Sequence, residues 1–139
     1  TSYLIGHPLD LNPARDFKAE TIINQTAGSA NVPFHLIWGA KDADNFYFLG
    51  INGDGKYMVG KNNGGQRVAI IDWTPSPAIN TKPVRNKLGL QKVGSRIKIL
   101  INDNPVNEIA YEKFYGNLVG FELVGKGKYE IDNLVFGNR

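Results

Sequence analysis

The sequence predicts an all-β fold, either a sandwich or a barrel, built from short strands that alternate with tight turns. Apolar runs recur roughly every ten residues, and clusters of Gly, Asn, Asp and Ser separate them. No stretch carries a sustained apolar period of 3.6 residues, so we expect at most one helical turn, at 110–115. The 16 glycines and 7 prolines among 139 residues are typical of many short strands and turns.

Ten strands are expected from these runs. In chain order they are 17–25, 34–40, 45–52, 56–61, 67–73, 87–93, 96–102, 106–110, 118–124 and 128–136. The intervening segments 52–55, 62–65, 92–95, 102–104 and 125–127 contain residues that tolerate a positive φ. Tight hairpins require such residues, so these segments are predicted to be turns.

The clearest hairpin joins the strands 45–52 and 56–61. We expect a three-residue loop, Gly53-Asp54-Gly55, that ends in a glycine with positive φ. On the core face this register pairs Ile51 with Tyr57, Leu49 with Val59 and Tyr47 with Lys61.

The other face of this hairpin has an unusual composition. It carries Phe46, Phe48 and Met58, together with Lys56 and two glycines. An antiparallel strand with one buried face normally presents polar residues on its outer face. The neighbouring runs 34–40 and 67–73 are also apolar on both faces, so this outer face is expected to meet something other than water.

The run 96–102 behaves differently. Its isoleucines, Ile97, Ile99 and Ile101, alternate with Arg96 and Lys98. This is the pattern of a strand with one buried and one solvated face. The sequence therefore predicts two sheets, of which one has a solvated outer face and the other does not.

Composition limits the class of protein. Hydrophobic residues make up 42% and charged residues 21% of the chain, which excludes a disordered chain. Without cysteine there is no disulfide, thiolate chemistry or Cys-based zinc site. The net charge of +3 is scattered along the chain, which argues against nucleic-acid binding. The chain starts at Thr1 without a methionine, so we expect one domain over 1–139 that belongs to a larger protein.

A family resemblance rests on several of these segments. Residues 34–57 read FHLIWGAKDADNFYFLGINGDGKY. This string resembles the strand–loop–strand–turn–strand signature of concanavalin A-like lectin/glucanase domains, closest to their laminin-G-like and 3-keto-disaccharide hydrolase-like branches. Segment 72–79 resembles the linker after their next strand, segments 86–90 and 94–102 resemble their following hairpin, and segments 116–121 and 131–135 resemble their closing strands. The resemblance covers about residues 17–136 and implies a two-sheet antiparallel jelly-roll sandwich with a concave, glycan-binding sheet.

The resemblance also implies where a ligand would lie. The concave strands would be 34–40, 45–52, 56–61 and 67–73, which makes their unusual apolar face the concave surface. The ligand-binding candidates on and beside this surface are His35, Phe46, Phe48, Lys56, Met58, Asp72 and Trp73. An exposed aromatic ring stacks on the apolar face of a sugar, whereas the same ring turned inward is a core residue. The register places Trp38 in the core and leaves both interpretations open for Trp73.

Catalytic and metal signatures are weak. Glucanases of this fold commonly carry Glu-x-Asp-x-x-Glu on one strand, and that motif is absent. Asp42 and Asp44 are expected to form Asx turns, and Glu130 and Asp132 to lie on a solvated edge. No catalytic residue and no cofactor is predicted. A structural calcium ion near Asp132, which some relatives have, is a minor alternative.

Three functions therefore compete. The first is a non-catalytic carbohydrate-binding module whose partner is a polysaccharide or oligosaccharide, joined to other domains of a larger protein. The second is a protein-interaction or structural module that docks through the apolar face. The third is a glycoside hydrolase-like enzyme. For the first we expect a bacterial protein that is extracellular, at the cell surface or periplasmic, without nucleic-acid partners or membrane insertion.

Overall fold

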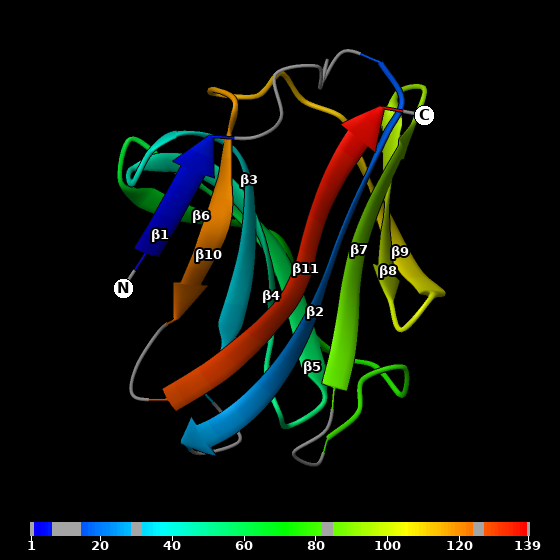
Figure 1. The fold of residues 1–139 in the computed structure, drawn as a ribbon. Coiled ribbons are helices and arrows are strands. Elements are labelled where there is room, and N and C mark those ends of the chain that lie inside the picture. Colours follow the sequence, from blue (N-terminus) through cyan, green and yellow to red (C-terminus); the bar gives the residue numbers. More distant parts are fainter. Residues whose placement is uncertain (1, 7–14, 29–31, 82–84, 124–126, 139) are drawn as a thin grey trace.

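The fold consists of two antiparallel β-sheets packed face to face (Figure 1). The computed structural model describes residues 2–6, 15–28, 32–81, 85–123 and 127–138 of the chain. These residues form eleven strands and no helix, so none of them belongs to a helix that would cross a membrane. The all-β jelly-roll prediction is confirmed.

The six-stranded sheet has the order β1-β10-β3-β4-β5-β6. Its strands are β1 (Ser2–Gly6), β10 (Leu118–Leu123), β3 (Phe34–Asp42), β4 (Asn45–Ile51), β5 (Lys56–Asn63) and β6 (Gln66–Pro75). The four strands predicted for the concave surface are neighbours in this sheet. β10 returns from the far end of the sequence and lies between β1 and β3, at the left of Figure 1.

The five-stranded sheet has the order β11-β2-β7-β8-β9. Its strands are β11 (Gly127–Asn138), β2 (Phe17–Gly28), β7 (Arg85–Val93), β8 (Arg96–Ile101) and β9 (Asn104–Ala110). The two 12-residue strands, β11 and β2, run side by side along one edge (Figure 1). All ten expected strands are present, seven of them longer than expected by two or three residues and three shorter by one, and β1 was not predicted.

The turns follow from the residues that the sequence places in them. Ile51 pairs with Tyr57, and Gly55 has a φ of 85°, as the three-residue loop predicted. The β8–β9 turn uses Asn102 and Asp103, both at positive φ, which is the two-residue geometry that matches the twist of the strands. Local turn chemistry therefore fixes the pairing of consecutive strands.

The main core lies between the two sheets. Trp38, Tyr47 and Leu49 of the six-stranded sheet face Leu90 and Ile99 of the five-stranded sheet in one buried cluster. The prediction that Trp38 belongs to the core is confirmed. Three aromatic side chains, Tyr111, Phe114 and Tyr115, pack against this core, and Tyr115 stacks on Tyr47 at 5.3 Å.

Candidate functional site

The candidate site lies on the outer face of the six-stranded sheet, the face turned away from the main core. Strand pairing aligns Glu122 on β10 with His35 on β3, and His35 with Gly50 on β4. Gly50 in turn pairs with Met58 on β5. The sheet therefore brings together residues that are up to 87 positions apart in the sequence.

A hydrogen-bonded charge network crosses this face. Nδ1 of His35 lies 2.8 Å from Oε1 of Glu122, and Nη2 of Arg67 donates to the same oxygen at 3.0 Å. Nε of Arg67 donates to Oδ1 of Asn62 at 2.9 Å, across the β5–β6 pairing. The guanidinium also lies 4.5 Å above the ring of Phe48, so packing and hydrogen bonds together fix Arg67.

The protonation states follow from this geometry. The hydrogen bond from His35, with that of Arg67, lowers the pKa of Glu122 to about 2. Burial lowers the pKa of His35, which outweighs the opposing effect of the Glu122 carboxylate. At neutral pH the site therefore holds an ionised Glu122, a charged Arg67 and a neutral His35 that donates its Nδ1 hydrogen.

Gly50 makes room for two side chains. A Cβ atom at this position would lie 2.7 Å from Cδ2 and 3.0 Å from Nε2 of His35, and 3.5 Å from Cη2 of Trp73. The edge of the imidazole and the tip of the indole therefore both lie over the Gly50 backbone. Trp73 retains 36% of its surface exposed, whereas His35 retains 2%. Trp73 is thus an aromatic surface residue beside the charge network.

The apolar residues of this face form a floor beneath that network. Ile37, Ala40, Phe46, Phe48 and Met58 make a second buried cluster, separate from the main core. Phe46, Phe48 and Met58, which were predicted as ligand contacts, have buried side chains, and their contact with a ligand stays a prediction. His35 stacks on Phe48 at 4.5 Å, and Phe46 packs edge-on to Phe48. The side chains were assigned to the correct face, but other side chains cover them.

The remaining predicted ligand contacts, Lys56 and Asp72, are exposed. Lys56 begins β5 and pairs with Pro75 near the end of β6. Oδ1 of Asp72 accepts a hydrogen bond from the backbone N–H of Trp73 at 2.8 Å, which fixes the backbone beside the indole. Their role in ligand binding stays a prediction.

The acidic residues that were candidates for metal binding do not lie close together. Asp42 forms the expected Asx turn, since its Oδ1 accepts the backbone N–H of Asp44 at 2.9 Å. Asp132 pairs with Arg85 at 3.1 Å. Within the described part of the chain, no three His, Asp or Glu side chains come together in a way that suits a metal ion. A structural calcium ion near Asp132 stays a prediction.

Two residues of the network, Arg67 and Glu122, were not predicted. Glu122 alternates with Phe121 and Leu123, which pack toward the main core, so a period of two assigns it to the outer face. The signal was therefore available, but nothing local reveals that β10 pairs with β3. Arg67 is the first residue of the expected strand 67–73, and nothing in the sequence indicates that its side chain extends across the sheet to Glu122.

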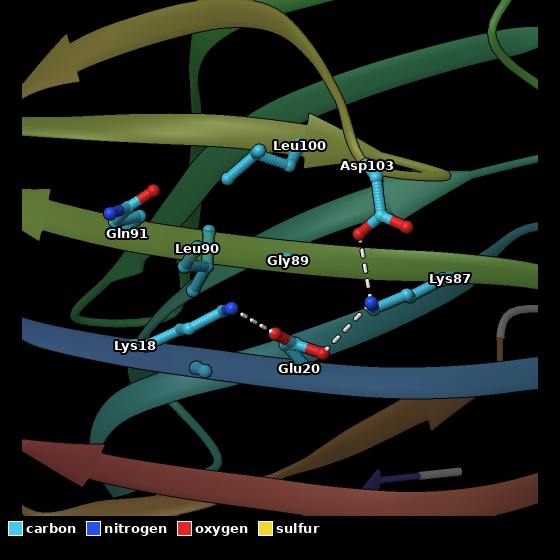
Figure 2. Close-up of a pocket in the computed structure, with 9 residues that line it drawn as sticks. Lys18, Glu20, Lys87, Gly89, Leu90, Gln91, Leu100 and Asp103 are labelled. Atoms are coloured by element: carbon cyan, nitrogen blue, oxygen red, sulfur yellow. Dashed lines mark hydrogen bonds and ion pairs between the residues drawn. The ribbon is translucent and has the colours of Figure 1, made fainter.

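The outer face of the five-stranded sheet offers a contrast. Figure 2 shows Glu20 between Lys18 and Lys87, at 2.7 and 3.2 Å, and Lys87 reaching on to Asp103 at 2.8 Å. The hollow above Gly89 measures about 50 Å³. Small-molecule sites usually measure roughly 300–1,000 Å³, so this hollow does not fit a sugar ring.

Two larger grooves lie at the ends and edges of the sandwich. One, of about 500 Å³, is lined by Phe121, Leu123 and Tyr129, where β10 and β11 diverge. The other, of about 720 Å³, lies between Pro75 and Pro77 on one side and Val106 on the other. Neither groove contains the charge network.

Solved structures share this architecture. The carbohydrate-binding module CBM66 from Bacillus subtilis is similar with a TM-score of 0.70 and 21% identity, over 88% of this chain and 74% of that one. Sheep galectin-11, in complex with glycerol, gives a TM-score of 0.70 and 10% identity, over 97% and 96%.

This chain has the concanavalin A-like lectin/glucanase fold. A glycoside hydrolase of family 43 from Bacillus licheniformis shares it with a TM-score of 0.61 and 9% identity, over 90% of this chain but 28% of that one. Identities this low establish the fold alone. No protein-family model and no curated protein sequence matches the chain.

Proposed function

We propose that the chain is a non-catalytic carbohydrate-binding module, and that a polysaccharide or oligosaccharide lies on the outer face of the six-stranded sheet. The observation that carries this proposal is the exposed indole of Trp73 beside the Arg67–Glu122–His35 network. A sugar has apolar ring faces and many hydroxyl groups. The indole of Trp73 offers a surface on which an apolar ring face can stack, and the network offers hydrogen-bond donors and acceptors for the hydroxyl groups.

The chemistry of the network fits binding better than catalysis. A glycoside hydrolase needs a carboxylic acid that holds a proton near neutral pH and releases it to the leaving oxygen. Glu122 accepts two charge-assisted hydrogen bonds, and its pKa is about 2. It is therefore ionised at neutral pH and suited to accept hydroxyl hydrogens rather than to protonate a leaving group.

The protein-docking alternative loses its main support. That hypothesis depended on an exposed apolar outer face, whereas Phe46 and Phe48 are fully buried, and His35 and Arg67 lie over the Phe48 ring. Among the described side chains of this face, Trp73 is a large apolar group that stays exposed, and it lies beside the charged Arg67 and Glu122. Such a surface favours a small, hydroxyl-rich ligand over a broad apolar protein contact.

A glycan array probed with the purified chain tests the proposal, with calcium and again with EDTA. The strongest glycan is then titrated calorimetrically into wild type, Trp73→Ala and Val68→Ala. Val68 is a matched control because it is also exposed and lies on β6. We expect Trp73→Ala to weaken binding at least about tenfold and Val68→Ala to leave it unchanged. Absence of binding to every glycan by the folded chain, or equal effects of the two variants, would contradict the proposal.

A further inference from the structure

One nitrogen of the network has no partner. Nε2 of His35 is buried and makes no hydrogen bond within the part of the chain that the structure describes, although Nδ1 of the same ring is bonded to Glu122. Buried polar atoms are nearly always satisfied, so an unsatisfied one calls for an explanation. We infer that Nε2 of His35 accepts a hydrogen bond from one hydroxyl group of a neutral glycan, and that Trp73 moves away from Gly50 to admit this hydroxyl. This inference rests on the proposed function and names the atom that selects the ligand.

The Glu122 contact makes Nε2 an acceptor. An ionised carboxylate only accepts hydrogen bonds, so Nδ1 must carry the hydrogen that fills the 2.8 Å contact. In a neutral imidazole the other nitrogen then has a free lone pair. Glu122 is itself held by Arg67 from β6, which fixes the orientation of the ring. The site therefore presents one acceptor in a defined direction.

The position of Trp73 explains why Nε2 of His35 is not accessible to a ligand in the free protein. The tip of the indole and Nε2 converge on the same point above Gly50. His35 is held between Glu122 and the ring of Phe48. Trp73 has fewer constraints, because it lies on the edge strand β6, beside a shift in the β5–β6 register, and is partly exposed. Trp73 is therefore the side chain that moves when the hydroxyl group of the glycan binds.

The charges of the site indicate the class of ligand. The Nε2 lone pair requires a hydrogen-bond donor such as a hydroxyl group, while the guanidinium charge of Arg67 is already compensated by Glu122. A carboxylate on the ligand would bring only acceptors and would face the Glu122 anion. The site accordingly favours a neutral sugar with free neighbouring hydroxyl groups over a uronic acid.

Two substitutions of His35 separate the roles of its nitrogens. Asparagine places a donor near the position of Nδ1 and leaves the position of Nε2 empty, whereas glutamine places an oxygen acceptor near Nε2. We expect His35→Asn to weaken binding of the best neutral glycan about tenfold or more, and His35→Gln to retain most of it. Tryptophan fluorescence should change when wild type binds, and Trp73→Phe should abolish that change, because Trp38 is in the core.

A direct measurement avoids the risk that a His35 variant fails to fold. In the His7→Gln protein, His35 is the sole histidine, and its Nε2 resonance is followed by ¹⁵N NMR during glycan titration. We expect the signal of an unprotonated nitrogen in the free protein and an upfield shift on binding. Glycan binding with an unmoved Nε2 signal, or equal affinities of wild type and His35→Asn, overturns the inference and leaves the proposed function intact. If wild type binds no glycan, the proposed function fails as well.

Discussion

The outer faces of the two sheets differ in the burial and in the polarity of their side chains. On the five-stranded sheet, charged side chains stand in water and pair with one another, as Glu20 does with Lys18 and Lys87 (Figure 2). On the six-stranded sheet, aromatic rings form a buried floor, and one ion network with His35 and Glu122 at its centre lies on top of it. The first face is a solvated surface of ordinary composition. The second is a small additional core, so polar groups there are specifically oriented and costly to disturb.

Removing a ring from the floor should have the largest effect. We expect Phe48→Ala to lower the free energy of unfolding by about 3–5 kcal/mol, because it deletes a fully buried ring that supports His35, Phe46 and Arg67. Lys98→Ala, on the solvated face, should change it by less than about 0.5 kcal/mol. Chemical denaturation measures both, and similar values for the two variants would remove the distinction between the faces.

A matched pair of glycines gives the next test. A Cβ at Gly50 would come within 2.7 Å of His35, whereas a Cβ at Gly89 meets Leu100 at an ordinary 3.4 Å. We expect Gly50→Ala to destabilise the fold by about 1–3 kcal/mol through overpacking. Gly89→Ala should be neutral or stabilise by up to about 1 kcal/mol, because alanine restricts the unfolded chain. Thermal melts of both variants measure these changes in stability. A Gly50→Ala variant as stable as wild type would show that His35 and Trp73 are loosely packed.

The acid response should differ between Glu122 and Glu20. Both have a lowered pKa in the fold, Glu122 through His35 first and Glu20 through Lys18 first. A carboxylate with a lowered pKa contributes stability above its unfolded pKa, and this stability is lost as pH falls. For Glu122 the loss extends from about pH 4.5 to about pH 2.

We therefore expect Glu122→Gln to lower stability at pH 7 by about 1–2 kcal/mol and to flatten the acid limb of the stability curve over that window. Glu20→Gln should flatten it less, because its more exposed carboxylate is better screened. Urea denaturation at a series of pH values measures the difference. An unchanged acid limb in Glu122→Gln would contradict the charge assignment of the site.

The smallest effect should come from the exposed pair Arg96–Glu108 on the solvated face. Nε of Arg96 lies 3.0 Å from Glu108 Oε1, and both side chains are about half exposed. We expect Arg96→Ala to cost less than about 1 kcal/mol and the loss to shrink further in 1 M salt. A double-mutant cycle with Glu108→Ala measures the coupling. A large, salt-independent coupling would mean that this face too is more than a solvated surface.

The candidate site was predictable only in part. Alternation along 34–40 and a position before Thr74-Pro75 sufficed to select His35 and Trp73. The same alternation selected Phe46 and Phe48, which are buried, because periodicity assigns a side chain to a face but does not show what covers it. Arg67 covers Phe48 from the neighbouring strand, and its reach depends on the three-dimensional course of β6. Glu122 becomes part of the site only through the pairing of β10 with β3.

Local sequence patterns specify the ten predicted strands, their turns and the register of consecutive pairs such as Ile51 with Tyr57. These features depend on side-chain period and on residues that accept positive φ, which act within a few positions. The tertiary structure decided that β10 lies between β1 and β3, that the second apolar face is closed, and that Nε2 of His35 has no partner. Contacts between residues up to 87 positions apart depend on the packing of all the strands together, and no local pattern specifies them.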